Sequence, residues 1–166
     1  MQHRFQRITP FLWFDTQTEE AVAFYTSIFP NSRVVTTTRY NKESAQASGR
    51  AEGSVMTMAF QLEGQDFTAI NGGPQFTFNG AISFVIHCQT QEEVDHYWNR
   101  LGEGGDPKAQ QCGWLRDRFG VSWQVVPTQL VELLSDPDPN RARRAMMAML
   151  GMKKLDIAAL QKAAAG

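Results

Sequence analysis

Residues 82–98, ISFVIHCQTQEEVDHYW, decide the fold because residues 9–25, TPFLWFDTQTEEAVAFY, follow the same plan. Each stretch reads as a short apolar strand, a polar cap and the start of an amphipathic helix. When Phe11 is placed on Phe84, an offset of 73 residues (84 minus 11), the Glu-Glu pair of the first stretch falls on the Glu-Glu pair of the second. The sequence therefore predicts two copies of one small structural unit.

Both stretches continue into a helix with one apolar face. The apolar residues recur at i, i+3, i+4 and i+7, the spacing of an amphipathic helix. They are Ala21, Phe24, Tyr25 and Ile28 in the first copy, and Val94, Tyr97, Trp98 and Leu101 in the second. Thr16 or Thr18 is expected to cap the first helix. Thr90 and Glu93 have the spacing of a capping box for the second.

Strand-like segments follow each helix. In the first copy they span residues 33–40, 55–62 and 66–71, and a shorter set in the second copy ends at residues 121–126. Each copy therefore reads as a strand, a helix and three further strands, which is a βαβββ module. The polar residues 41–53, NKESAQASGRAEG, lengthen the first copy and are interpreted as a flexible loop or arm between two strands.

A four-stranded sheet with one helix leaves its second face open, so two such modules must cover each other. We therefore predict an α+β fold in which residues 8–71 and 81–126 form paired βαβββ modules within one domain, residues 1–127. The concave surface between the two sheets would hold a ligand. Residues 128–166 have helical periodicity and are predicted to form a C-terminal helical extension. Its Met-rich stripe is expected to cover core or a partner subunit, with a flexible lid over the cleft as the alternative.

Composition limits the classes of partner. The chain has 166 residues, of which 42% are hydrophobic, and its 16 basic and 17 acidic residues leave a formal net charge of -1. This balance argues against nucleic acid and against an anionic membrane surface. The apolar run at residues 11–14 is too short for an export signal or a membrane span. Cys88 and Cys112 are interpreted as reduced thiols, so we expect a cytoplasmic protein whose partners are small molecules or its own copies.

Four segments carry a resemblance to a known family. They begin at Ile8, Gly64, Cys112 and Met152, and they read ITPFLWFDTQTEEAVAFYTSIFPNS, GQDFTAINGGPQFTFNGAISF, CGWLRDRFGVSWQVVP and MKKLDIAAL. Together they resemble the PhnB-like branch of the vicinal oxygen chelate superfamily, which includes glyoxalases, dioxygenases and bleomycin-binding proteins. This branch is often called 3-demethylubiquinone-9 3-methyltransferase-like. The resemblance covers residues 8–160 and implies paired βαβββ modules, usually in a homodimer.

The resemblance also implies where a metal would be held. Metal-dependent members of the superfamily have a His on the first strand and a Glu on the last strand of each module. In this chain those positions fall on Ile8, Ala81, Thr68 and Gln124. A divalent transition metal needs three or four nitrogen, sulfur or carboxylate donors around one point. We therefore expect no metal ligands and no divalent-metal cofactor.

Strand alternation selects the candidate catalytic residues. If Phe84 faces the helix, Ser83 and His87 face the cleft, because successive side chains of a strand point to opposite sides. His87 titrates near neutral pH as a residue type and is the candidate general acid or base. Gln124 is the second candidate and would orient a substrate carbonyl. A hydrogen-bonded structural histidine and an exposed strand glutamine are the alternative interpretations.

Aromatic side chains complete the candidate ligand site. Trp114 offers a platform on which a planar ligand could stack, and Phe76 and Phe78 are expected to line the same cleft. Cys112 is a candidate ligand contact, with a packed thiol as the alternative because no basic residue adjoins it in the sequence. The backbone of residues 71–74, Asn-Gly-Gly-Pro, could hold an anion, although a turn explains these residues more simply.

Three functions are compatible with the sequence alone. The first is a small-molecule-binding or metabolic enzyme of the superfamily that lacks the usual metal ligands. The second is the methyl transfer in the family's name, with S-adenosylmethionine as the donor. A doubly wound methyltransferase has a glycine-rich loop after its first strand, whereas here the strand runs into DTQTEE, which argues against this cofactor. The third is a protein that sequesters a ligand without catalysis.

Overall fold

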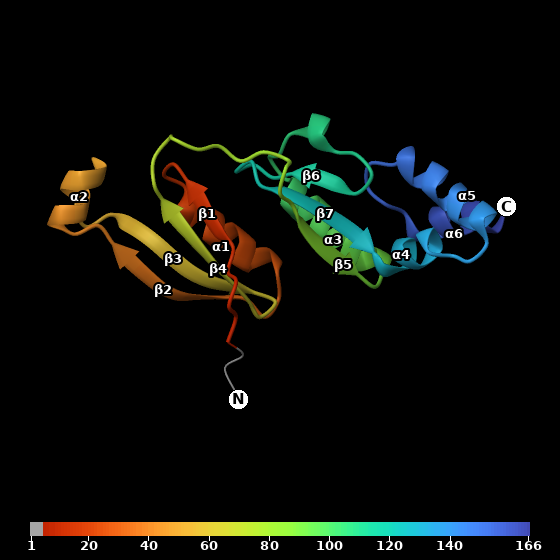
Figure 1. Cartoon of the computed structure of the whole chain (residues 1–166), viewed down its shortest axis with the longest axis horizontal. Helices are drawn as coiled ribbons and strands as arrows, with labels where there is room; N and C mark the ends of the chain where they lie inside the picture. Colours follow the sequence, from red (N-terminus) through yellow and green to blue (C-terminus); the bar gives the residue numbers. More distant parts are fainter. Residues whose placement is uncertain (1–4) are drawn as a thin grey trace. The chain divides into compact units, whose positions relative to one another are not determined.

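The computed structural model describes residues 5–166 and divides into two compact units, one ending at Thr77 and one spanning Phe78–Gly166. The first unit contains the first copy of the repeat, and the second contains the second copy and the C-terminal helices (Figure 1). Each unit is described by itself below. Both combine one small sheet with helices, so the predicted α+β class is confirmed.

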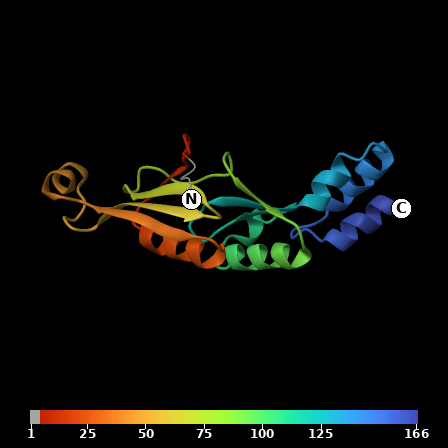
Figure 2. The ribbon, with the colours of Figure 1, turned by 90° about the horizontal axis from the view of Figure 1, so that it is seen from below.

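The first unit is a four-stranded sheet with the order β1-β4-β3-β2. Its elements are β1 (Phe11–Phe14), α1 (Thr18–Ile28), β2 (Arg33–Arg39), α2 (Lys42–Ser48), β3 (Val55–Leu62) and β4 (Gln65–Asn71). The strand β1 runs parallel to β4, and the other neighbours are antiparallel. The helix α1 covers one face of the sheet (Figure 2). Tyr25 and Val22 of this helix are completely buried, as expected for the apolar face of an amphipathic helix.

The interpretation of residues 41–53 as a flexible loop is wrong in part, because this segment contains the helix α2 at the end of β2 (Figure 1). Asn41 accepts a hydrogen bond from the backbone N–H of Ser44, and the Ser44 hydroxyl accepts one from the N–H of Asn41. This reciprocal pair is a capping box. Gly49 closes the helix with φ of 73°, a left-handed conformation that glycine adopts without strain.

The second unit has a three-stranded sheet with the order β5-β7-β6. Its elements before the C-terminal helices are β5 (Phe84–Cys88), α3 (Gln91–Gly102), a 3-10 turn (Pro107–Ala109), β6 (Trp114–Arg116) and β7 (Ser122–Pro127). The prediction of three strands after this helix is therefore wrong, because only β6 and β7 follow α3 within the described residues. A 3-10 turn follows α3 where the first copy has β2, and it starts at Pro107 with the Asp106 carboxylate as its cap.

The first strands of the two copies correspond at an offset different from the predicted 73. β4 and β7 end at Asn71 and Pro127, an offset of 56 (127 minus 71). Leu12 pairs with Ala69, and Ile86 pairs with the equivalent residue of β7. The first strands therefore correspond at 74 (86 minus 12), while the helices keep the offset of 73.

The reason for this difference is the connection between strand and helix. It has three residues in the first copy, 15–17, and two in the second, 89–90. A shift of one residue moves every side chain of a strand to the opposite face, so the predicted offset equated opposite faces of the two first strands. With the corrected offset the equivalent of Ile8 is Ile82 rather than Ala81, and this side chain is no metal ligand either.

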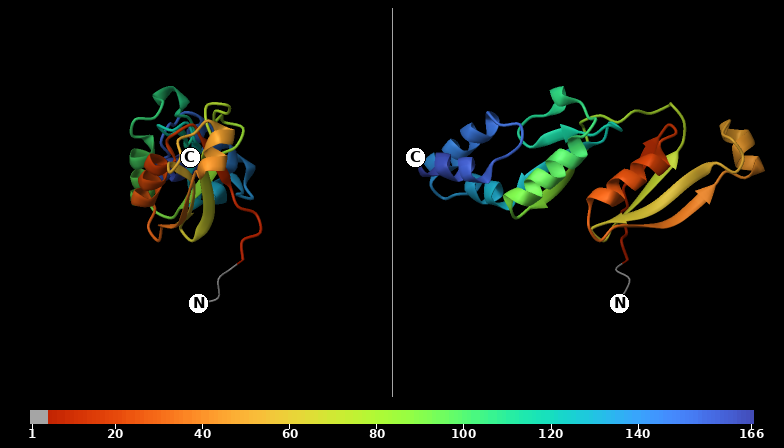
Figure 3. Two further views of the ribbon diagram at one scale, coloured as in Figure 1. Left: turned by 90° about the vertical axis from the view of Figure 1, so that its left-hand side faces the viewer. Right: turned by 180° about the vertical axis from the view of Figure 1, so that it is seen from behind.

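The C-terminal extension is confirmed and consists of α4 (Thr128–Leu134), α5 (Pro139–Leu150) and α6 (Ile157–Ala165), which pack as a group (Figure 3). Its core contains Leu130, Leu155 and Leu160, with Met149 packed against them. The Met-rich stripe of α5 thus covers core in part, whereas Met147 on the same helix is 62% exposed. No helix within residues 5–166 is long and apolar enough to cross a bilayer.

Candidate functional site

One face of the β5-β7-β6 sheet packs under α3. Phe84 lies against Trp123 with their ring centroids 5.4 Å apart, and Trp123 and Val125 of β7 are buried. Cys88 is completely buried on the same side, where burial and the carboxylate of Glu93 raise the pKa of its thiol to about 12. This cysteine is therefore a core residue that stays protonated at neutral pH.

The other face of this sheet carries the site residues predicted from the sequence. In the register of the sheet Val85, Gln124 and Trp114 lie side by side across the three strands. His87 is two residues beyond Val85 and shares its face. The side-chain amide of Gln124 donates a hydrogen bond of 2.9 Å to the hydroxyl of Ser83. The structure thus brings an aromatic ring, an amide, a hydroxyl and an imidazole to one face, which we call the open face.

The side chains of the open face are accessible. Val85 is 44% exposed and Trp114 is 36% exposed, whereas Gln124 is half-buried. His87 is exposed and makes no hydrogen bond or ion pair with any residue of 5–166. The alternative of a hydrogen-bonded structural histidine therefore lacks a partner within the described part of the chain. An unpaired imidazole on an accessible strand remains able to exchange protons with a ligand.

Cys112 and Gly113 have a structural role beside the open face. Their backbone N–H groups donate hydrogen bonds of 2.8 Å to the carbonyl oxygens of Met152 and Lys153, which precede α6. Both residues are left-handed, with φ of 51° and 84°. Gly113 also lies so close to Leu155 that a Cβ atom would come within 2.9 Å of that side chain. The backbone of Cys112 and Gly113 therefore holds the segment before α6, a contact that we call the clasp, and Trp114 lies on the open face. A ligand contact by the Cys112 thiol stays a prediction.

The two phenylalanines predicted for the site lie in different units. Phe76 belongs to the first unit, where its ring meets that of Trp13 edge to face at a centroid distance of 5.1 Å. Phe78 belongs to the second unit and lies near Gly120. Neither is part of a strand. A cleft shared by the two sheets, with Phe76 and Phe78 in its lining, stays a prediction.

Arg116 is the residue that sequence reasoning missed. It pairs with Ser122 in the register and stands two positions from Trp114, so it shares the open face. Its Nε atom is buried and has no hydrogen-bond partner among residues 5–166. The adjacent Asp117 is engaged elsewhere, since it accepts hydrogen bonds from the Val121 N–H and from the Trp123 indole. The sequence did contain a signal, because Arg116 stands two residues after Trp114 and residues two apart on a strand share a face. The adjacent charged residues Asp117 and Arg118 made Arg116 look like one of a group of surface charges.

The residues present do not fit the metal that the superfamily implies. Among residues 5–166 no three His, Cys, Asp or Glu side chains gather as ligands of an ion would. Thr68 and Gln124, at the last-strand positions, offer a hydroxyl and an amide. A neutral amide that is already bonded to Ser83 is a weak ligand for a transition metal. No step of a reaction is therefore assigned to a metal.

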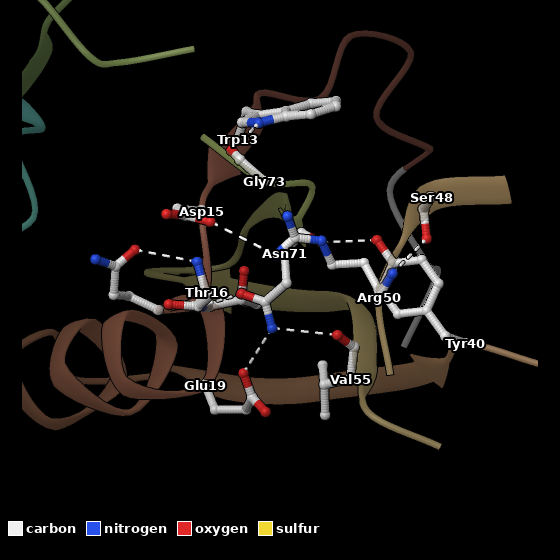
Figure 4. A network of polar contacts seen from close by, with 12 residues as sticks. Trp13, Asp15, Thr16, Glu19, Tyr40, Ser48, Arg50, Val55, Asn71 and Gly73 are labelled. Carbon is white, nitrogen blue, oxygen red and sulfur yellow. Dashed lines mark hydrogen bonds and ion pairs between the residues drawn. The ribbon is translucent and has the colours of Figure 1, made fainter. Parts of the chain in front are cut away.

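Asn71 organises the polar network of the first unit, at the ends of β1 and β4 (Figure 4). Its side-chain oxygen accepts a hydrogen bond of 2.8 Å from the N–H of Thr18 and so caps α1. Its amide nitrogen donates to Glu19 and to the carbonyl of Val55. The expectation that Thr16 or Thr18 caps this helix is therefore wrong.

The cap of α3 follows the prediction in part. The hydroxyl of Thr90 accepts a hydrogen bond from the N–H of Glu93, as expected. The Glu93 carboxylate, however, accepts from the N–H of Gln89 rather than from that of Thr90. Thr90 is thus the N-cap of α3, as predicted, but the Glu93 side chain bonds the backbone N–H one residue before the N-cap.

The sequence favoured a turn over residues 71–74, whereas in the structure Gly72 and Gly73 lie alongside the end of β1 and the turn follows at residues 74–75. The N–H groups of Gly72 and Gly73 donate to the carbonyl oxygens of Phe14 and Asp15, so they are not free to hold an anion. The indole of Trp13 donates to the carbonyl of Gly73. A Cβ atom on Gly72 would come within 2.3 Å of the Trp13 ring, which explains why only glycine fits there.

Comparison with known proteins places the chain in context. The family described as 3-demethylubiquinone-9 3-methyltransferase matches residues 6–126. A PhnB protein from Bacillus cereus that bears the same description is 37% identical, with a TM-score of 0.62 over 74% of this chain and 99% of that one. A search of the curated proteins gives no match.

Two more distant structures share the fold alone. The protein PA1353 from Pseudomonas aeruginosa is 21% identical, with a TM-score of 0.57, and the match covers 74% of this chain and 98% of that one. The fosfomycin resistance protein FosX from Listeria monocytogenes, in complex with Mn(II) and sulfate, is 16% identical with a TM-score of 0.50. That match covers 78% of this chain and 95% of FosX.

Proposed function

Because the chain belongs to the 3-demethylubiquinone-9 3-methyltransferase family, the PhnB-like branch of the vicinal oxygen chelate superfamily, we propose that it binds a small planar organic molecule on the open face without a metal. Trp114 supplies the surface for stacking, and Gln124 and Ser83 supply polar contacts. His87 is the general acid or base of any reaction that takes place there. The observation that carries the proposal is the common face of Trp114, Gln124 and His87 in the sheet register.

The chemistry of the open face fits a ligand that is mostly apolar and has one polar edge. Small-molecule sites combine apolar and aromatic side chains with a few polar groups that fix orientation. Val85 and Trp114 provide the apolar part. The Gln124 amide donates to Ser83 through its nitrogen, so its carbonyl oxygen is available to accept from a ligand. Histidine as a residue type titrates in the range in which proton transfer at neutral pH is effective, which suits His87 to this role.

A second candidate function is sequestration of the same ligand without turnover. It uses the same contacts and differs only in that His87 takes no part. A binding assay and a turnover assay on His87→Ala separate the two. Loss of turnover with retained affinity indicates catalysis by His87, and ligand binding without turnover in both wild type and the variant indicates sequestration.

Methyl transfer, the activity in the family's description, needs a site for S-adenosylmethionine. In this chain β1 connects to α1 through Asp15, Thr16 and Gln17, without a glycine that would let the backbone approach a nucleotide. The sheets of four and three strands also differ from a doubly wound parallel sheet. These features favour metal-free binding over methyl transfer.

We further propose that the protein works as a homodimer in the cytoplasm. Homodimers are usual for paired βαβββ modules, and the exposed Val34 and Val35 on the edge strand β2 leave apolar surface that a second copy could cover. Cys88 and Cys112 are both free thiols, as in a reducing compartment. Light scattering at micromolar concentration tests the dimer, and cell fractionation tests the location.

Calorimetric titration tests the proposed function. We expect 2-naphthamide, a neutral planar probe, to bind wild-type protein, and Trp114→Ala to lose this binding. Mn²⁺, Zn²⁺ and S-adenosylmethionine are titrated in parallel and should give no stoichiometric heat. Tight binding of either ion would restore metal catalysis. Tight binding of S-adenosylmethionine would favour methyl transfer, and unchanged naphthamide binding by Trp114→Ala would remove the open face as the site.

A further inference from the structure

We propose that the ligand of the open face carries a carboxylate and that Arg116 is the residue that binds it. The inference rests on the proposed function and narrows it to a class of ligand, the small aromatic carboxylic acids. In this arrangement the ring of the ligand stacks on Trp114 and the carboxylate meets the guanidinium. Both side chains come from β6.

The placement of the two residues matches such a ligand. Trp114 and Arg116 are separated by one residue on β6, and the intervening Leu115 is buried on the opposite side under α3. Residues two apart on a strand are roughly 7 Å apart and point to the same side. A flat bicyclic acid spans a distance of this order. Gln124, the register partner of Trp114, lies beside the ring position.

Arg116 is half-buried, and its side chain lacks partners among residues 5–166. Its Nε is buried without a hydrogen bond, and the side chain forms no ion pair with any residue of 5–166. An unsatisfied buried donor destabilises the folded state, and more so when it is charged. A carboxylate bound to the guanidinium would offset part of this cost through its charge. The planar guanidinium fork presents two parallel N–H groups that match the two oxygens of a carboxylate.

The neighbouring charges do not compete for this role. Asp117 holds the turn before β7 through the N–H groups of Phe119 and Val121, and its second oxygen accepts from Trp123. Arg118 is exposed, with its guanidinium 5.1 Å from the centre of the Phe119 ring. Arg116 is thus the permanent positive charge on β6 that faces the ligand position. One fixed positive charge matches a monoanion, which favours a carboxylate over a phosphate dianion.

The test compares two probes of equal shape and different charge. Isothermal titration calorimetry measures 2-naphthoate and 2-naphthamide against wild type, Arg116→Gln and the control Arg118→Gln, which removes the same charge two residues away. We expect wild type to bind naphthoate about tenfold or more tightly than naphthamide, as for a charge-assisted pair. Arg116→Gln should bind both probes equally, with unchanged affinity for naphthamide. Arg118→Gln should behave as wild type does.

Each other outcome overturns the inference in a recognisable way. If wild type binds both probes with equal affinity, and this binding still needs Trp114, the inference that the ligand carries a carboxylate is refuted. The proposed function is not affected by this result. Failure of both probes to bind wild type removes the proposed function together with the inference. If wild type binds 2-naphthyl phosphate more tightly than naphthoate, the inferred carboxylate is refuted and the ligand class is phosphate esters.

The stability of the unliganded protein gives a second measurement. If Arg116 serves a ligand, Arg116→Gln should have a melting temperature equal to or above that of wild type, because it removes an unsatisfied charge. A melting temperature several degrees lower than that of Arg118→Gln would show that Arg116 is a structural residue, and would overturn the assignment.

Discussion

Replacing Asn71 by Asp changes two attractive contacts of the first unit into repulsive ones. The side-chain nitrogen of Asn71 donates to the Val55 carbonyl at 3.1 Å and to a Glu19 carboxylate oxygen at 2.8 Å. An Asp side chain presents an oxygen in its place. Its other oxygen still accepts from the Thr18 N–H, so the cap of α1 is retained. The substitution therefore isolates the loss of the donor.

The magnitude follows from the burial of each partner. The carbonyl of Val55 is left buried without its donor, which costs about 1–3 kcal/mol. Glu19 is exposed and can turn toward water, so its repulsion adds only about 0–1 kcal/mol. The two terms together cost about 1–4 kcal/mol at pH 7, with a central value of about 2.5 kcal/mol. For a unit of this size each kcal/mol lowers the melting temperature by about 4–8 °C, so we expect a central loss of about 10–20 °C.

The pH dependence gives the sign of the effect. Burial and the nearby Glu19 carboxylate should raise the pKa of the introduced carboxyl in the folded state above its unfolded value, about 3.9. A raised carboxyl pKa destabilises the fold when the pH lies above the unfolded value, and the destabilisation disappears as the pH falls below that value. The deficit of Asn71→Asp relative to wild type should therefore shrink between pH 7 and about pH 4.

Urea unfolding at both pH values, with the exposed Asn31→Asp as the matched control, measures these quantities. The control makes the same chemical change in the same unit and should differ from wild type by less than about 0.5 kcal/mol. A deficit for Asn71→Asp as small as that of the control, or one that is the same at pH 4 and pH 7, would refute the reasoning.

Three further predictions concern the second unit. Gly113→Ala should lower the free energy of unfolding in urea by about 3 kcal/mol, because φ is 84° and the new Cβ meets the Val125 carbonyl. The control Gly49→Ala has similar backbone strain but open space around its Cβ, and should lose about 1 kcal/mol. Equal losses would contradict the clasp. Cys88, whose pKa is raised to about 12, should resist a thiol reagent at pH 8 while Cys112 reacts, and equal labelling rates by mass spectrometry would refute this difference. The folded state should also lose stability from about pH 9 upward, because the Cys88 thiol ionises there only in the unfolded chain. His87→Ala should leave the melting temperature nearly unchanged while ligand affinity or turnover falls, and a large loss of stability alone would make His87 structural.

Local patterns predicted the elements of the repeat with good accuracy. The strand predicted at residues 55–62 is β3 to the residue, and the helix with the apolar stripe from Ala21 to Ile28 is α1. Strand alternation also predicted the side of β5 on which His87 lies. These predictions succeed because the period of apolar residues depends only on the local backbone and on which face is buried.

The errors arose where a distant residue supplies the missing group. Asn71 caps α1 from β4, 53 positions along the chain from Thr18, and no spacing rule within the helix could find it. The backbone contact of Cys112 was out of reach of local patterns for the same reason, because the carbonyl oxygen that its N–H meets belongs to Met152, 40 residues away (152 minus 112). The second copy has a 3-10 turn at Pro107–Ala109 where the first copy has β2, and the repeat argument carried the strand over although Asp106 and Pro107 are residues that favour turns.

The amino-acid sequence by itself determined the doubled strand-helix plan and the amphipathic helices, because the period of apolar residues is a property of neighbouring residues. The tertiary structure alone decided which faces of the two first strands correspond, since the two connections differ by one residue and a one-residue slip exchanges the faces. It also decided that, within the described residues 5–166, the Arg116 side chain next to Trp114 has no partner, because pairing depends on where Asp117 directs its oxygens.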